Sequence, residues 1–353
     1  MATTVLYKKD SDKHQKEYET KTIINPLKKL IPKASSGRLR GIKLPKYIIF
    51  KIDEANKVLN LYIQEQDALK DGNPIKLNAA CCNMQTDNAA FEGWAICLKA
   101  WMPDKIEKVV LGWDIPETQD ENTHYNRFLY RVLRFSQQYE WFSVMAKNAT
   151  RVENFNNQYN ELEINYSNSD PKKKEGSPEN AVEYEFVKTP QLSTQIKQHY
   201  DLLNLDHQLH VGVRAHKKPL FTGGQSAIDL WGLNNRVLTI IELKYSQNKT
   251  PNTKVGIISE LFLYSCIIRD MACGILPTPH NAILEHEREL FSTIKSVEII
   301  KAEMLADSFH PLIENTKVFD VLNQTCSSFK GKTIEYGMTT YSYDRNKLII
   351  YDR

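Results

Sequence analysis

The sequence lacks the cysteine spacing of a zinc finger or of a disulfide scaffold. Six cysteines occur among 353 residues, and none forms a Cys-x-x-Cys pair, although Cys81 and Cys82 are adjacent. Zinc fingers and ribbons gather their thiolates through such short spacings. We therefore expect reduced thiols, as in an intracellular protein.

Long hydrophobic runs are also missing. No stretch approaches the roughly 20 apolar residues that a membrane-spanning helix needs. The N-terminal segment MATTVLYKKDSDKHQKEYET lacks the apolar core of a secretory signal. These absences predict a soluble, cytoplasmic protein without a membrane partner.

The chain has little net charge and no nucleotide-binding glycine motif. Its 46 Lys and Arg residues balance 43 Asp and Glu residues to +3, which excludes histone-like basicity. A nucleic-acid partner would need a local basic patch. Gly223, Gly224 and Gly256 form neither a GxGxxG nor a Walker sequence, so nucleotide-fuelled chemistry has no support.

The chain has enough apolar residues for a hydrophobic core, and its length suggests two domains. Hydrophobic residues make up 41% and charged residues 25%, close to globular averages. Residues 166–180 are rich in Ser, Asn, Pro and Gly and carry a short lysine run, which is typical of a linker. We expect an N-terminal α+β domain over 1–165 and a second domain over 181–353.

An acid-free basic window spans Lys21–Ile52 and contains several prolines and glycines. The window is typical of an extended arm rather than a regular helix. Its basic residues suit phosphate contact, with Arg38, Arg40 and Lys43 as candidate nucleic-acid-binding residues. A solvated entry segment explains the same pattern equally well.

The rest of the first domain shows a small α+β pattern without a catalytic constellation. Alternating apolar residues predict strands, two of them paired as a hairpin, and a 3.6-residue period predicts one helix. The strands are Tyr47–Asp53, Val58–Gln64, Ala90–Trp101 and Lys108–Trp113, and the helix is Asn126–Tyr139. We expect the tryptophans of this half to belong to the core, with base stacking as the alternative.

The second half alternates helices with apolar strands, which predicts an α/β core. Thr189-Pro190 starts a helix, and the turn Asn234-Asn235 joins two strands as a hairpin. The predicted helices are 189–203, 255–271 and 311–322, and the predicted strands are 208–214, 227–233, 237–245, 297–304, 334–343 and 348–351.

One of these strands carries two charged residues after an apolar run. Glu242 and Lys244 are two apart, so their side chains share one face. A carboxylate and an ammonium at the end of a buried strand need a reason. Asp229 lies on the hairpin partner, in a register that allows it to meet Glu242.

Two neighbouring carboxylates repel each other unless they share a cation or a proton. A hard ion such as Mg²⁺ or Mn²⁺ takes oxygen ligands of this kind. Asp229, Glu242 and the carbonyl of Leu243 are the candidate metal ligands. Lys244 is then placed to hold a water for attack on phosphorus or to stabilise developing charge.

Ile228-Asp229 and Glu242-Leu243-Lys244, with a turn between them, resemble the PD-(D/E)xK nucleases of restriction-endonuclease-like fold. The segment Glu260-Leu261-Phe262-Leu263-Tyr264 is similar to the Gln-x-x-x-Tyr helix of the RecB-like branch, with Glu in place of Gln. The resemblance covers roughly residues 180–305.

This resemblance implies a mixed sheet flanked by helices and a site that hydrolyses phosphodiesters. Asp229 and Glu242 would bind the metal, Lys244 would be the catalytic lysine, and Glu260 and Tyr264 would support the metal or the scissile strand. The family often places a further acid on the preceding helix. Glu185 is the candidate for that acid, and Glu183 is the alternative.

Other charged residues near this segment have simpler explanations. His207, His210 and His216 are expected to be solvated, with metal ligation as the alternative. Lys249 and Lys254 flank the loop before the helix, where a basic helix N-terminus suits a phosphate, and a solvated loop fits equally well. The run Glu285–Glu289 is expected to be an exposed helix face.

The sequence thus predicts a Mg²⁺- or Mn²⁺-dependent deoxyribonuclease with a restriction-endonuclease-like α/β domain. DNA is the expected partner, RNA is possible, and many enzymes of this fold act as homodimers. A role in restriction or phage defence rests on the fold alone. The alternative is a non-catalytic nucleic-acid-binding or assembly protein that retains the fold.

Overall fold

The computed structural model describes residues 5–7, 13–31, 42–70, 73–84, 86–117, 123–157, 162–165, 178–215, 218–219, 227–246, 254–278, 285–324, 329–344 and 347–351. The chain divides into two compact units. Unit 1 comprises Met1–Asn157 and Pro311–Val321, and unit 2 comprises Gln158–His310 and Leu322–Arg353. The division therefore falls earlier than the linker expected at 166–180, most of which lies outside the described residues. Unit 1 also takes in a segment from the C-terminal half.

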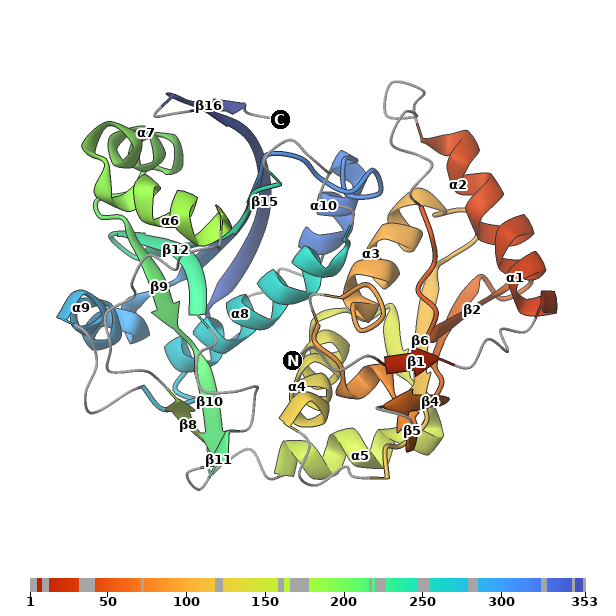
Figure 1. The fold of residues 1–353 in the computed structure, drawn as a ribbon. Helices are drawn as coiled ribbons and strands as arrows, with labels where there is room; N and C mark the ends of the chain where they lie inside the picture. The colour runs from red at the N-terminus through yellow and green to blue at the C-terminus, as the bar shows by residue number, and fades with distance from the viewer. Residues whose placement is uncertain are drawn as a thin grey trace. The chain divides into compact units, whose positions relative to one another are not determined.

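Unit 1 contains a four-stranded mixed sheet in the order β2-β3-β6-β7 (Figure 1). Strands β2 and β3 form the expected antiparallel hairpin, whereas β6 and β7 add in parallel. The strands are β2 (Ile48–Asp53), β3 (Val58–Ile63), β6 (Lys108–Trp113) and β7 (Phe142–Val144). Strand β2 is one of the two edge strands of this sheet.

Three helices contribute to the aromatic core of unit 1, and one of them corrects the sequence prediction. Helices α3 (Phe91–Trp101), α4 (Thr123–Gln138) and α5 (Ala146–Asn157) follow in chain order. The segment predicted as strand Ala90–Trp101 is α3. Nearly all of its residues are buried, so no polar face reveals the helical period. Trp94 and Trp113 are fully buried, which confirms the core interpretation for these two.

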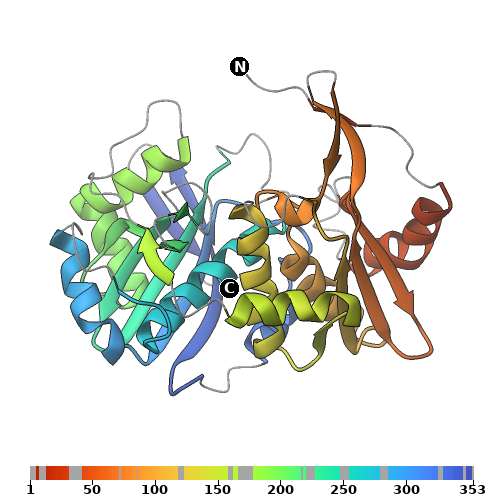
Figure 2. The ribbon, with the colours of Figure 1, turned by 90° about the horizontal axis from the view of Figure 1, so that it is seen from below.

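The N-terminal part of the predicted basic arm is helical. Helix α1 (Lys13–Glu19), a π-helical turn η1 (Thr20–Ile24) and α2 (Asn25–Leu30) run without a break. Pro26 is the second residue of α2 and follows the π-helical turn closely. In both ribbon views the red α1–α2 segment lies beside β2 (Figures 1 and 2). Arg38 and Arg40 lie outside the described residues.

A second small sheet in unit 1 has the order β1-β4-β5. Its strands are β1 (Val5–Tyr7), β4 (Gln66–Lys70) and β5 (Asn73–Leu77). The 3₁₀ turn η4 (Ala79–Cys81) follows β5. No described helix is long and apolar enough to cross a membrane.

Unit 2 is built on a six-stranded mixed sheet in the order β16-β15-β14-β13-β12-β9. Strands β13, β14 and β15 are parallel, and the other neighbouring pairs are antiparallel. The strands are β9 (Asp206–His210), β12 (Ala227–Asn234), β13 (Val237–Lys244), β14 (Ile299–Ala306), β15 (Thr333–Asp344) and β16 (Lys347–Tyr351). Helices pack on this mixed sheet, so the unit has the α/β class that the sequence predicts.

Helices cover the two faces of this sheet. The apolar residues of α6 (Pro178–Lys188) and α7 (Pro190–Tyr200) pack with Ile241 and Leu243 of β13. Helix α8 (Gly256–Ala272) contacts β13, β14 and β15, and every one of its residues is buried (Figure 1). Its burial on all sides explains why its apolar residues extend around the whole helix.

Several boundaries in the second half differ from the prediction. Helix α7 begins at Pro190 with Thr189 as its N-cap residue, as predicted, but an unpredicted helix, α6, begins at Pro178, inside the predicted linker. The predicted strand 208–214 is split at Val211 into β9 and β10 (Gly212–Ala215), which joins a small sheet with β8 (Leu162–Asn165) and β11 (Lys218–Pro219). The remaining helices are α9 (Glu285–Thr293), the 3₁₀ turn η8 (Ile294–Ser296) and α10 (Thr316–Asn323), shorter than predicted.

Candidate active site

The candidate site lies where the β12–β13 hairpin stops pairing. Their last paired residues are Leu230 and Ile241, and continuing the register sets Asp229 opposite Glu242. Beyond this point the Leu243 N–H donates its hydrogen bond to the side chain of Asp229, at 2.8 Å from Oδ2, instead of to a backbone carbonyl of β12. The hairpin turn lies at Asn235-Arg236, one residue later than expected, and Asn235 adopts a φ of 55°.

Strand alternation separates the charged residues of β13 from its apolar ones. Ile241 and Leu243 belong to the core beneath α6 and α7. Glu242 and Lys244 therefore point to the opposite face, towards α8, where Glu260 meets them. The expected same-face arrangement of Glu242 and Lys244 is present.

One ammonium group lies among four carboxylates, which we call the acidic cluster (Asp229, Glu242, Glu260 and Glu179). Lys244 Nζ is 2.5 Å from Glu242 Oε1, and it is 3.6 Å from Glu260 Oε2. It is also 4.0 Å from Asp229 Oδ2 and 3.4 Å from Glu179 Oε1. A single positive charge cannot neutralise four negative charges in a buried site, so the cluster favours a further proton or cation.

Burial and mutual repulsion shift the protonation of this cluster. Burial raises the pKa of Asp229 to about 7, against the pull of the Lys244 ammonium. Burial, together with Asp229 and Glu260, raises the pKa of Glu242 well above its usual value. Burial alone would lower the pKa of Lys244, but the surrounding carboxylates raise it well above the ordinary value. Lys244 is thus a permanent cation at neutral pH.

The carbonyl of Leu243 faces the same side as Asp229. The N–H and C=O of a strand residue point to one side of the strand, and the Leu243 N–H points to Asp229. The next carbonyl, that of Lys244, accepts from the Asp307 N–H at 3.2 Å, on the β14 side. The Leu243 carbonyl oxygen is therefore directed to the open end of the hairpin. This is the carbonyl that the sequence analysis predicts as a metal ligand.

Helix α8 contributes Glu260 and Tyr264 one turn apart. The Tyr264 hydroxyl donates to Glu260 Oε1 at 3.4 Å, and both side chains are buried. Burial, and to a smaller extent the negative charge of Glu260, raises the pKa of Tyr264 well above its usual value. Tyr264 is thus a neutral hydrogen-bond donor that orients Glu260.

Helix α6 supplies acids that the sequence assigned differently or missed. Glu185, the first candidate, accepts a hydrogen bond from the Tyr343 hydroxyl instead of reaching the cluster. Glu183, the alternative, is buried, and burial together with Asp229 raises its pKa to about 8. Glu179 contacts Lys244 and also accepts the Tyr245 N–H at 3.3 Å. The signal for Glu179 was its spacing of four from Glu183, which was hidden because the helix was expected to start later.

The histidines beside the site are not solvated as expected. His207 and His210 are both buried. Asp206 Oδ1 lies 2.9 Å from His207 Nδ1, and Glu287 Oε1 lies 2.8 Å from His210 Nδ1. Glu287 is fully buried, so α9 does not expose the whole of its acidic face.

The predicted basic residues near the site are only partly described. Lys254 is exposed and lies just before α8 begins. Lys249 and His216 fall outside the described residues. The sequence therefore located Asp229, Glu242, Lys244, Glu260 and Tyr264 in one place, whereas the phosphate-contacting role of the loop stays a prediction.

The donor types of the cluster fit a hard divalent ion, although the described arrangement is organised around Lys244. Carboxylate and carbonyl oxygens are the ligands that Mg²⁺ and Mn²⁺ prefer. Glu242 Oε2 is buried and accepts no hydrogen bond from the N–H and O–H groups of the described residues. Within the described ranges, however, no three His, Cys, Asp or Glu side chains converge as ligands. Metal binding would therefore require the Lys244 ammonium to withdraw from Glu242.

Comparison of the chain with protein-family models, with curated proteins and with solved structures finds no match.

Proposed function

We propose that the protein is a metal-dependent nuclease of the PD-(D/E)xK type, with a restriction-endonuclease-like unit 2, that hydrolyses DNA phosphodiester bonds. The observation that carries this proposal is that Asp229, Glu242 and Lys244 lie together at the end of one hairpin. A carboxylate oxygen of Asp229 and one of Glu242 each lie within 4.0 Å of the Lys244 ammonium nitrogen. Surface ion pairs do not crowd carboxylates in this way, because each added like charge raises the free energy of the folded state.

The residues divide the chemistry between them. Asp229, Glu242 and the Leu243 carbonyl would hold Mg²⁺ or Mn²⁺, which when bound polarises a phosphoryl oxygen and lowers the pKa of a water. Lys244, once withdrawn from Glu242, would place a positive charge beside the phosphate and so assist the attack of water. Glu260, oriented by Tyr264, accepts hydrogen bonds from the attacking water.

The exposed fractions of the side chains indicate which of them a phosphodiester would meet first. The Lys244 and Asp229 side chains keep 18% and 15% exposure, whereas those of Glu242 and Glu260 keep 2% and 3%. Substrate therefore meets Lys244 and Asp229 first, while Glu242 and Glu260 stay behind them. DNA as substrate, a homodimeric assembly and a role in phage defence remain part of the proposal.

The second candidate is a non-catalytic nucleic-acid-binding or assembly protein that retains this fold. The observation in its favour is the Lys244 ammonium, which is already in contact with Glu242 at 2.5 Å. In a protein of this class the lysine would serve as an internal counterion for the carboxylates.

A cleavage assay separates the two candidates. Plasmid, single-stranded DNA and RNA are incubated with the protein in Mg²⁺, Mn²⁺ or EDTA. Asp229→Ala and Lys244→Ala should each lower the rate by about 100-fold or more, as expected when an electrostatic contact to the reacting phosphate is lost. Glu185→Gln is the matched control, because this acid is held by Tyr343.

The outcomes of the cleavage assay separate the nuclease from the non-catalytic candidate. Cleavage that survives both alanine substitutions would refute the assignment. Binding of nucleic acid without cleavage in any metal would favour the non-catalytic candidate. Circular dichroism spectra confirm that each variant is folded before its rate is interpreted.

A further inference from the structure

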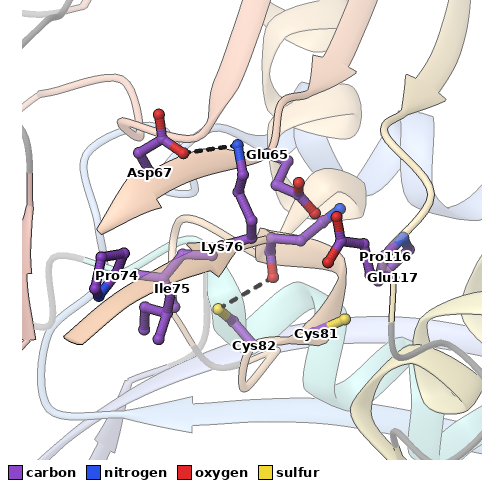
Figure 3. Close-up of a pocket in the computed structure, with 11 residues that line it drawn as sticks. Glu65, Asp67, Pro74, Ile75, Lys76, Cys81, Cys82, Pro116 and Glu117 are labelled. Carbon is purple, nitrogen blue, oxygen red and sulfur yellow. Dashed lines mark hydrogen bonds and ion pairs between the residues drawn. The ribbon is translucent and has the colours of Figure 1, made fainter. Parts of the chain in front are cut away.

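Among the cavities lined by described residues of unit 1, two have similar volumes and lining charges of opposite sign. The first has a volume of about 520 Å³ and is lined by three acids, Glu65, Asp67 and Glu117, and by Lys76 (Figure 3). Lys76 Nζ is paired with Asp67 at 2.6 Å. The remaining carboxylates give this cavity a negative character, so it is unsuited to an anion.

The second cavity, which we call the lysine groove, has a volume of about 570 Å³. It lies between α1–η1 and the start of β2, and three lysines, Lys16, Lys43 and Lys46, line it. All three side chains are exposed. Lys43 is also one of the residues that the sequence suggested for phosphate contact.

The only acid that lines the lysine groove, among the described residues, is engaged elsewhere. Glu19 Oε1 accepts hydrogen bonds from Gln15 Nε2 at 2.8 Å and from the Phe50 N–H at 3.1 Å. Burial also raises the pKa of Glu19. Its charge is thus partly hidden from the groove, and the lysines set the electrostatic potential there.

The edge of β2 ends in this groove. Side chains of the α1 helix satisfy the outward backbone groups of Phe50 and Ile52, the latter through the Tyr18 hydroxyl. Ile48 is next in the same row and lines the groove. Because Ile48 keeps 2% exposure, it forms part of the wall of the groove.

Uncharged groups complete the lining. Gln64 and Gln66 supply amides, and Ile24, Leu44 and Ile49 supply apolar surface. A positively charged groove along the phosphate backbone is one of the two features by which proteins bind single-stranded nucleic acid, the other being aromatic side chains for base stacking. The lysine groove has the first of these features.

We propose that the lysine groove binds the phosphates of a single-stranded nucleic acid. The occupant is a polyanion rather than an added peptide strand, because side chains of α1 already occupy the outward backbone groups of Phe50 and Ile52. Three ammonium groups in the lining favour phosphates. This second site does not depend on the cleavage chemistry of unit 2.

The test is a binding measurement in EDTA, with the full-length protein and a fluorescein-labelled 15-nucleotide oligothymidylate. Anisotropy is followed from about 50 to 200 mM salt. The triple variant Lys16→Gln/Lys43→Gln/Lys46→Gln should bind about tenfold or more weakly at low salt. Its slope of log affinity against log salt should fall by about 2, because each lost phosphate contact on a single strand removes about 0.7.

The matched control is Lys76→Gln, which removes a lysine from the acidic cavity and should leave the affinity unchanged. A triple variant with wild-type affinity and salt slope would overturn the proposal. Full displacement of the oligonucleotide by millimolar inorganic phosphate would also overturn it, in favour of a small-anion site. Because EDTA abolishes metal-dependent cleavage, the nuclease assignment can fail while this result stands, and the reverse also holds.

Discussion

The acidic cluster of unit 2 and the lysine groove of unit 1 both carry unbalanced charge, but they differ in burial. In the acidic cluster the carboxylates of Glu242 and Glu260 are almost inaccessible to water. In the lysine groove all three ammonium groups are exposed. A buried imbalance is relieved by shifted pKa values and by ion binding, whereas an exposed one is relieved by salt. The two regions should therefore respond to different experimental variables.

The largest change in the free energy of unfolding is expected when the central cation of the acidic cluster is removed. Lys244→Met leaves the buried carboxylates uncompensated, and we expect the free energy of unfolding to fall by about 3 kcal/mol at pH 8. The loss should shrink at pH 5, where these carboxyls hold protons. Urea unfolding at both pH values measures it, with the exposed Lys254→Met as control. An equal loss at both pH values would show that the carboxylates are not the cause.

The next effect concerns Asp229, whose folded pKa of about 7 exceeds the ordinary value of 3.8. The folded state holds a proton that the unfolded state releases, so this stabilisation is complete below pH 3.8 and is lost as the pH rises through 7. Asp229→Asn removes the charge, and we expect it to be about 2 kcal/mol more stable than wild type at pH 8. The exposed Glu289→Gln should not change this profile. An Asn variant less stable than wild type at pH 8 contradicts the burial argument.

A divalent metal should relieve the same imbalance. At pH 8 and ten times its dissociation constant, Mg²⁺ should stabilise the protein by about 1.4 kcal/mol. Differential scanning calorimetry detects this as a rise in Tm that EDTA reverses. Glu242→Gln should abolish the rise, whereas Glu185→Gln should keep it. An equal rise in both variants would place the ion elsewhere.

The smallest effect should be on the stability of the lysine groove. The triple glutamine variant loses only exposed charges, so its free energy of unfolding should stay within about 0.5 kcal/mol of wild type. A larger loss in urea unfolding would mean that these lysines hold unit 1 together, and that the groove is not comparable to an exposed binding surface.

The sequence predicted the parts of the site that lie close together along the chain. Glu242 and Lys244 are two residues apart, and Asp229 follows from the hairpin register, so strand geometry alone brings them together. Helix spacing sets Glu260 and Tyr264 on one helix face, whereas their place in the site was implied by the resemblance to the Gln-x-x-x-Tyr helix. Only Asp229, Glu242 and Lys244 needed no more than local periodicity and one turn.

Contacts between distant residues were not predictable. His210 and Glu287 are 77 positions apart, and nothing local marks either as buried. Helix α3 was mistaken for a strand because its burial on nearly all sides removes the polar face that distinguishes the two periods. The acid of α6 was misassigned because the sequence pattern did not predict this helix, which begins at Pro178, ahead of the predicted helix at Pro190.

The hydrogen bond from the Leu243 N–H to Asp229 gives the site a built-in spectroscopic reporter. Every backbone amide of a paired strand normally reports only on the sheet, but this one ends on a titrating carboxylate. The ¹⁵N chemical shift of Leu243 should therefore follow the protonation of Asp229, and its hydrogen exchange should slow when a cation occupies the cluster. A single resonance can thus follow proton and metal occupancy in solution without any substrate.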